Sequence, residues 1–207
     1  MLADHPLTRW DAEQSYFAQE SAVRQSVVVF HFCPSRRRDD TISHAGDVDA
    51  RGTHFAGGLG DYAAVAGDGS PAPDWAGPDA NGALTMAVVV EKHEGRLTQW
   101  KSRTRLESLR RGASNTLLLG EKHVPPGGHG DAAFGDGTLY SGQHSASFAR
   151  AAGPGFPLAA SLEAPFQYNF GGIHSRVCNF LMADGSTRPT TYDIQETILA
   201  ELARRGE

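Results

Sequence analysis

The sequence is poor in cysteine and has no long hydrophobic run. Cys33 and Cys178 are the two cysteines among 207 residues, too few for a disulfide scaffold and too far apart for a zinc knuckle. The longest apolar runs, VVVF at Val27 and MAVVV at Met86, are far shorter than the roughly 20 residues that a membrane-spanning helix needs. The polar N-terminus, MLADHPLTRW, also lacks the apolar core of a signal peptide. We therefore expect no membrane span and no export signal in this chain.

An excess of positive charge is also missing. The chain has 19 lysines and arginines against 24 acidic residues, giving a formal net charge of -5, so we expect no nucleic-acid partner. Three consecutive arginines at residues 36–38 are followed directly by Asp39 and Asp40. We interpret this stretch as a short solvated charge cluster rather than a phosphate-binding patch.

Glycine and proline are plentiful, with 24 and 11 residues, which favours turns and short strands over long helices. Hydrophobic residues make up 40% and charged residues 21% of the chain, as in globular proteins. The length fits one domain over residues 1–207. Two segments, 35–82 and 125–165, are loop-rich, and we interpret them as insertions into that domain.

The local patterns predict an antiparallel α+β domain with a C-terminal helix. A helix is expected over residues 8–25, with Thr8 as its N-cap. Strands and helical turns follow from β-branched runs and glycine boundaries. The expected strands are residues 26–32, 61–67, 83–93 and 114–123, with helical turns at 104–112.

The C-terminal part gives the clearest signals. Two strand-like runs, RVCNFLMA and STRPTTY, flank Asp184-Gly185, which predicts a hairpin whose two turn residues both take positive φ. Asp193 is then expected to cap a helix, with Glu196 reaching back to it. The apolar stripe of this helix consists of Ile194, Ile198, Leu199 and Leu202.

Metal and catalytic motifs are weak. His123, His129 and His144 have no metal-protease spacing, so we interpret them as polar loop residues. The Asp-Gly pairs at Asp68, Asp136 and Asp184, and Asp79 near Asn81-Gly82, offer carboxylates for calcium without the alternating spacing of a calcium loop. No Gly-x-Ser-x-Gly motif is present. We expect no catalytic residue, no metal site and no cofactor. Calcium remains a minor candidate, and a hydrolase is the least favoured class.

His174 and Asp184 lie in one motif, which raises the question whether the imidazole and the carboxylate act together as a chemical site. The strand between them would span roughly 26 Å, so we expect them at opposite ends of it. Asp184 then serves the turn, and His174 ties the incoming loop to the sheet through a ring hydrogen bond. Cys33 and Cys178 either form a disulfide or remain two buried thiols, and we favour the thiols.

Several motifs occur in the order of a known family. FHFCPS contains Cys33 and Pro34, GDYAAVAGDGS follows, and FGGIHSRVCNFLMADGS contains His174, Asp184 and Gly185. Between them, RLESLRRGASNTLLLGEKH contains Ser114, Asn115, Thr116 and Glu121, with Arg111 where the family has Asp. The chain resembles a bacterial family of pilin-like proteins, the His-x9-Asp-Gly family or domain of unknown function 1559, over most of residues 27–207.

The resemblance implies a pilin-like antiparallel sheet and structural roles for the motif residues. The long N-terminal membrane helix of the family is absent here. Because the family is similar to type II secretion pseudopilins, the implied function is a non-enzymatic assembly protein, the headgroup of a cell-envelope or secretion-related filament. Its partners would be other pilin-like subunits or secretion machinery, in the periplasm or cell envelope. The alternative is a surface module that binds a glycan or calcium on its loop face.

Overall fold

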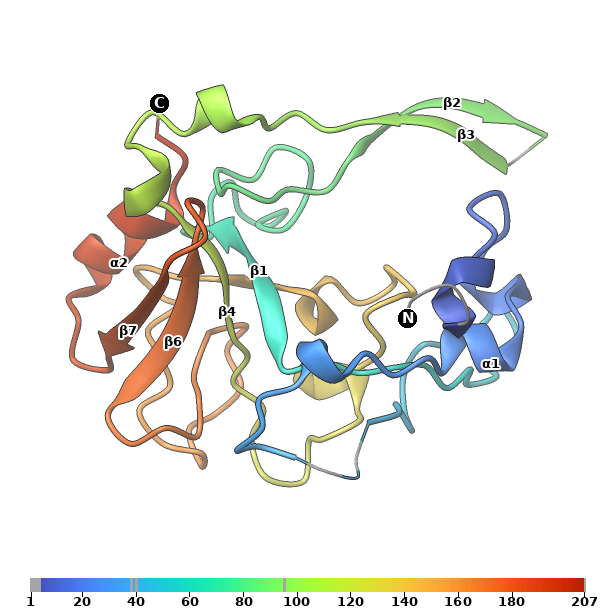
Figure 1. Ribbon diagram of the computed structural model, residues 1–207, viewed down its shortest axis with the longest axis horizontal. Coiled ribbons are helices and arrows are strands. Elements are labelled where there is room, and N and C mark those ends of the chain that lie inside the picture. The colour runs from blue at the N-terminus through green and yellow to red at the C-terminus, as the bar shows by residue number, and fades with distance from the viewer. Residues whose placement is uncertain (1–4, 38, 40, 95, 207) are drawn as a thin grey trace. The chain divides into compact units, whose positions relative to one another are not determined.

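The computed structural model describes residues 5–37, 39, 41–94 and 96–206 (Figure 1). Its contacts divide the chain into two compact units. The first unit contains Met1–Asp61, Val89–Trp100 and Gly127–Phe148; the second contains Tyr62–Val88, Lys101–Pro126 and Ala149–Glu207. The prediction of one domain stays a prediction, whereas the mixed α+β class is confirmed. Among the helices described, none is long and apolar enough to cross a membrane.

The second unit is built on a five-stranded sheet with the order β5-β1-β4-β6-β7. Figure 1 shows β4 between β1 and β6. Three of the neighbouring pairs are antiparallel, as predicted, but β1 pairs with β5 in parallel, a pairing that the sequence did not predict. The strands are β1 (Tyr62–Gly67), β4 (Leu117–Glu121), β5 (Ala149–Ala151), β6 (Val177–Met182) and β7 (Thr187–Thr191).

Helix α2 (Glu196–Ala203) covers the apolar core of this unit. Leu199 and Ala203 of α2 pack with Phe180 and other buried sheet residues. The predicted cap is wrong: the N-cap residue is Gln195 without a side-chain bond, and the Glu196 carboxylate accepts a hydrogen bond from Gly155 N at 3.1 Å. The predicted stripe is only partly buried, since Leu199 is 0% exposed and Ile198 49%.

The hairpin between β6 and β7 is confirmed, but its turn differs from the prediction. Gly185 has a φ of 87°, whereas Asp184 is not among the residues with positive φ. Met182 N donates to Ser186 O and Gly185 N donates to Met182 O, so the three residues 183–185 form the loop. A longer loop with glycine in the left-handed position replaces the two-residue turn.

The described residues of the first unit form short helical turns and most of the β2–β3 pair. The turns are η1 (Pro6–Arg9), η2 (Tyr16–Ala18), α1 (Ser21–Arg24), η3 (Val29–His31), η6 (Ala132–Phe134) and η7 (Ser145–Ser147). The helix predicted over residues 8–25 is therefore wrong. The buried Gln19 side chain hydrogen-bonds both N and O of Asp11, and such side-chain bonds compete with a continuous helix.

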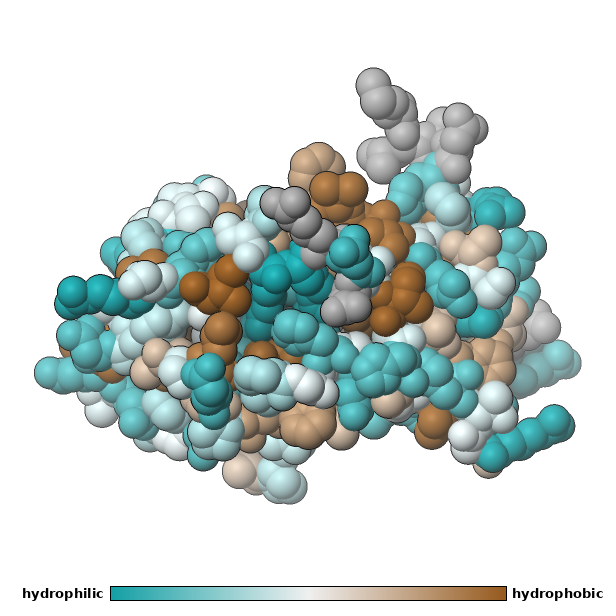
Figure 2. All heavy atoms as spheres, turned by 90° about the horizontal axis from the view of Figure 1, so that it is seen from below, coloured by the Kyte–Doolittle hydropathy of each residue, from teal (hydrophilic) through white to brown (hydrophobic). Residues whose placement is uncertain are grey.

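The strand predicted over residues 26–32 is also wrong. Residues 29–31 of this segment form the η3 turn, in which Val29 and Phe30 are 77% and 90% exposed. The strand predicted over 83–93 is shorter, as β2 (Val88–His93), and pairs with β3 (Arg96–Lys101), which was not predicted. Figure 2 shows hydrophobic residues at the surface among polar ones.

Arg37 is a buried charged residue of the first unit. Its guanidinium is buried and donates to Asp136 at 2.7 and 2.9 Å and to Asp61 at 2.7 Å. Asp61 Oδ2 also accepts from Cys33 N, and Asp136 Oδ2 from Gly130 N. The prediction of a solvated cluster is wrong for Arg37 and for Arg36, whose side chain is also buried; Arg38 and Asp40 lie outside the described residues.

Two turns of the second unit complete the list of helical elements, η4 (Leu106–Ser108) and η5 (Ala113–Asn115). They confirm the predicted helical turns at 104–112 only in part, because η4 has three residues. Gly112, with a φ of 87°, begins the η5 turn instead of closing a longer helix.

Candidate functional site

Glu121 is a buried carboxylate at the end of β4. Its Oε2 accepts a hydrogen bond from Asn179 N of β6 at 2.7 Å, and its backbone O accepts from Gly171 N at 3.0 Å. A Cβ on Gly172 would come within 2.5 Å of Oε2, so only glycine fits there without displacing the carboxylate. Glu121 thus fastens the loop before β6 to the sheet.

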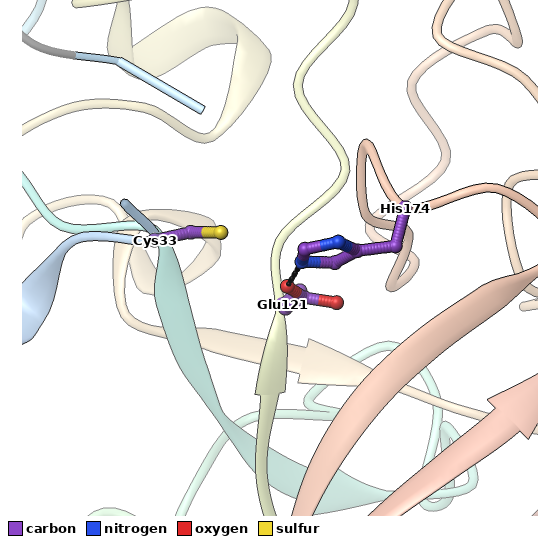
Figure 3. A group of neighbouring side chains, drawn as sticks. All are labelled: Cys33, Glu121 and His174. Carbon is purple, nitrogen blue, oxygen red and sulfur yellow. Dashed lines mark ion pairs between the residues drawn. The ribbon is translucent and has the colours of Figure 1, made fainter. Parts of the chain in front are cut away.

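His174 completes this connection. Its Nε2 lies 2.9 Å from Glu121 Oε1, and Figure 3 shows the imidazole pointing toward the carboxylate. Because a carboxylate is only an acceptor when ionised, Nε2 carries the shared hydrogen. The side chain of His174 is 31% exposed while that of Glu121 is buried. The ring bond that the sequence predicted to tie the loop to the sheet is present, with Glu121 as its partner.

A cleft of about 510 Å³ opens beside His174. Three loop segments form it: residues 160–162, 172–176 and 191–193. The Tyr192 hydroxyl joins two of them, since it donates to Gly172 O at 2.9 Å and accepts from Gly172 N at 3.3 Å. His174, which Glu121 holds, therefore lies in the wall of a cleft in the second unit.

Asp184 and Gly185 lie elsewhere, in the turn after β6. Asp184 Oδ1 accepts from Ser186 Oγ at 2.6 Å and from Ser186 N at 2.9 Å. These hydrogen bonds, the side-chain one first, lower the pKa of Asp184 below its usual value. His174 precedes β6 and Asp184 follows it, as the separation argument predicts, so the motif joins two independent local structures.

The segment Ser114, Asn115 and Thr116 forms the turn that leads into β4. Asn115 Nδ2 donates to Arg111 O at 3.1 Å, and Thr116 Oγ1 donates to Gly112 O at 3.0 Å. These bonds satisfy carbonyl groups of the turn, and Thr116 is fully buried. The segment orients β4, at whose far end Glu121 lies.

Both cysteines are buried thiols, in agreement with the favoured interpretation. Cys33 is in the first unit, where its backbone N donates to Asp61, and Pro34 beside it is exposed. Cys178 is in β6, and its Sγ lies 3.8 Å from Glu121 O.

The loop histidines have separate surroundings. His123 is buried in the second unit, with its Nε2 2.7 Å from Ala164 O. His129 belongs to the first unit, where burial first, and then nearby Arg37, lower its pKa. His144 is the N-cap residue of η7.

The other aspartates considered for calcium, Asp68, Asp79 and Asp136, are engaged by nitrogen donors. Asp68 accepts from Asn81 Nδ2 at 2.8 Å and from Arg204 Nε at 2.6 Å. Burial raises the pKa of Asp68, but these bonds outweigh it and lower the pKa overall. Asp136 serves Arg37, and Asp79 pairs with Arg103. Each of these carboxylates forms an ion pair with an arginine side chain.

Sequence reasoning named Glu121 and His174 separately but did not pair them. It did not identify Arg176 and Asp193 as charged residues that line the cleft. It also missed the buried ion pairs of Arg37. Arg37 and Asp136 are 99 positions apart in the sequence, which hides their pairing. One signal was present: polar residues cluster where the strands of the sheet begin and end.

The comparison with protein families supports the family that the sequence resembles. A protein-family model described as "Protein of unknown function (DUF1559)" matches residues 4–197. A search of curated proteins and a search of solved structures found no match. Because the family match covers nearly the whole chain, the protein belongs to the DUF1559 family.

Proposed function

We propose that this protein is a non-enzymatic assembly subunit of pseudopilin type, the headgroup of a cell-envelope or secretion-related filament. Membership of the DUF1559 family supports a role of this general kind. The finer assignment rests on the resemblance of the motifs to pilin-like proteins and on the use that the fold makes of its polar side chains.

The observation that carries the proposal is that the buried charged groups fasten loops to one another. Glu121 holds His174 and the backbone of β6. In the first unit, Arg37 holds Asp61 and Asp136. A catalytic carboxylate must meet a substrate, whereas these carboxylates are buried and accept hydrogen bonds from donors of the chain itself. Such a network supports an architectural role.

Exposed apolar side chains support contacts with other subunits. In the first unit, Phe30 is 90% exposed, and the β2–β3 pair exposes Val90 by 55% and Trp100 by 54%. An isolated two-stranded sheet is marginally stable, and its open edges favour pairing with another chain. Aromatic side chains such as Phe30 and Trp100 are enriched at protein–protein interfaces.

Photo-crosslinking in the native host tests the proposal. Phe30 and Trp100 are replaced one at a time by benzoylphenylalanine, which keeps an aromatic side chain at each position. After irradiation of cells that make the full-length protein, mass spectrometry identifies the cross-linked peptides. We expect peptides of pilin-like subunits, including copies of this chain. Leu106, which is 74% exposed in the second unit, is the matched control.

The proposal fails if neither position yields more pilin-like cross-links than Leu106. It also fails if the peptides recovered come from soluble metabolic enzymes. A filament headgroup should instead give position-dependent cross-links to a small set of related subunits.

A further inference from the structure

The cleft beside His174 has the size of a binding site for a small molecule. Its volume of about 510 Å³ lies within the range of ligand pockets in proteins. All three segments that line it belong to the second unit. The assembly role does not use this cleft.

The walls of the cleft are fixed by interactions behind them. His174 is held by Glu121, and the Tyr192 hydroxyl is held by both backbone groups of Gly172. The third wall is held by His123, whose Nε2 lies 2.7 Å from Ala164 O, next to the turn that begins at Ser161. A preformed cleft loses little conformational entropy when a ligand binds.

The rim carries polar side chains that the protein itself does not engage. Within the described residues, the guanidinium of Arg176 and the carboxylate of Asp193 have no hydrogen-bond or ionic partner. The same holds for the hydroxyls of Ser161, Ser175 and Thr191. Arg176 also has a φ of 68°, a backbone conformation that costs free energy for a side chain other than glycine.

We propose that this cleft binds a small neutral saccharide. One exposed cation, one exposed anion and three hydroxyls can donate to and accept from the vicinal hydroxyls of a sugar ring. The half-exposed Leu162 and Ile173 offer apolar surface for the C–H faces of the ring. A strongly charged ligand would meet a like charge on either Arg176 or Asp193, so the balance of the rim selects a neutral molecule. The inference goes beyond the assembly role and does not depend on it.

Isothermal titration calorimetry with the full chain tests whether the cleft binds a saccharide. The probes are cellobiose, maltose and diacetylchitobiose, with citrate and spermidine as charged comparators. We expect saturable binding of at least one disaccharide with a Kd of about 1 mM, and weaker binding of both charged compounds. Arg176→Asn and Asp193→Asn should each raise the Kd for the disaccharide by about tenfold or more. Asn tolerates the left-handed backbone at position 176.

Arg188→Asn is the matched control, because Arg188 is an exposed arginine of β7 that does not line the cleft. It should bind the disaccharide as the unchanged protein does, and melting curves of all three variants should show that they fold. Absence of saturable binding by every disaccharide overturns the proposal. Binding that survives both cleft variants, or preferential binding of citrate or spermidine, overturns it as well.

Discussion

The two units of this protein are stabilised in different ways. In the second unit, a sheet and α2 enclose an apolar core that includes Phe170, Phe180 and Leu199. In the first unit, short turns surround buried polar groups, with Asp47, Asp61 and Asp136 all fully buried. Apolar burial tolerates imprecise geometry, whereas buried ions require matched partners. One chain therefore contains a packed region and a region whose loops are fixed by ion pairs.

The contrast explains where sequence patterns succeed. Regular burial on one face of a strand gives a periodic sequence. Arg37 and Asp136 are 99 positions apart, and no period connects them. The following predictions test whether the two units respond differently to mutation and pH, from the largest expected effect to the smallest.

Arg37→Met should have the largest effect on stability. The substitution keeps much of the side-chain volume but leaves Asp61 and Asp136 as buried carboxylates without the guanidinium. Burial lowers the pKa of Arg37, but Asp136 and Asp61 outweigh burial and raise it overall. These carboxylates therefore favour the charged form of Arg37. Removing one partner of a buried ion pair costs about 3–5 kcal/mol. Urea unfolding measures the loss.

Arg9→Met in the same unit is the control, because the Arg9–Glu20 pair is largely exposed. It should change the free energy of unfolding by about 0–1 kcal/mol. Equal losses from the two substitutions would show that the buried network does not fix the first unit.

Leu199→Ala tests the apolar core of the second unit. Leu199 is 0% exposed and packs in the core cluster, so its truncation should cost about 2–5 kcal/mol through lost burial and a residual cavity. Ile198→Ala, one position along α2 and 49% exposed, should cost much less. If thermal melting gives both variants the same loss, α2 does not contribute to stability through the buried side of the helix.

Much of the second unit could be predicted from its sequence, since β1, β4 and the β6–β7 hairpin follow from short apolar runs and an Asp-Gly turn. The first unit could not. VVVF has high strand propensity, but its residues have no strand partner within the described part of the chain, and Phe30 lies in the solvent. The three arginines looked solvated because a local charge pattern does not show that Asp136 is the partner of Arg37. The candidate site was half predicted: Glu121 and His174 were both named, but only the fold brings them together.

Glu121→Gln should have an intermediate effect. The amide can still accept from Asn179 N, but the charge that pairs with His174 is lost. Weakening a buried hydrogen bond to a charged group costs about 1–3 kcal/mol. Glu163→Gln, at an exposed position of the same unit, is the control. A double-mutant cycle with His174→Gln should give a coupling energy of about 0.5–3 kcal/mol, and a coupling near zero would mean that the pair contributes nothing to stability.

The smallest effect concerns pH and the first unit. Burial is the largest cause that lowers the pKa of His129 from 6.5, and burial also lowers that of His31. Because the unfolded chain then binds protons more readily than the folded one, stability is complete above the unfolded pKa of about 6.5. It decreases as the pH falls through that value toward the lower pKa of the folded state. Mild acid should therefore weaken the first unit before it weakens the Asp68 contacts of the second.

His129→Gln should reduce this pH dependence. Urea midpoints measured from about pH 7.5 to pH 5 should fall less steeply in the variant than in the unchanged protein, because one group that takes up a proton on unfolding is gone. His93→Gln replaces an exposed histidine of the same unit and should leave the slope unchanged. Amide hydrogen exchange at each pH assigns the loss to a unit. If the amides of β4 and β6 lose protection in mild acid before those near Arg37 do, the order of stability inferred from the two kinds of core is wrong.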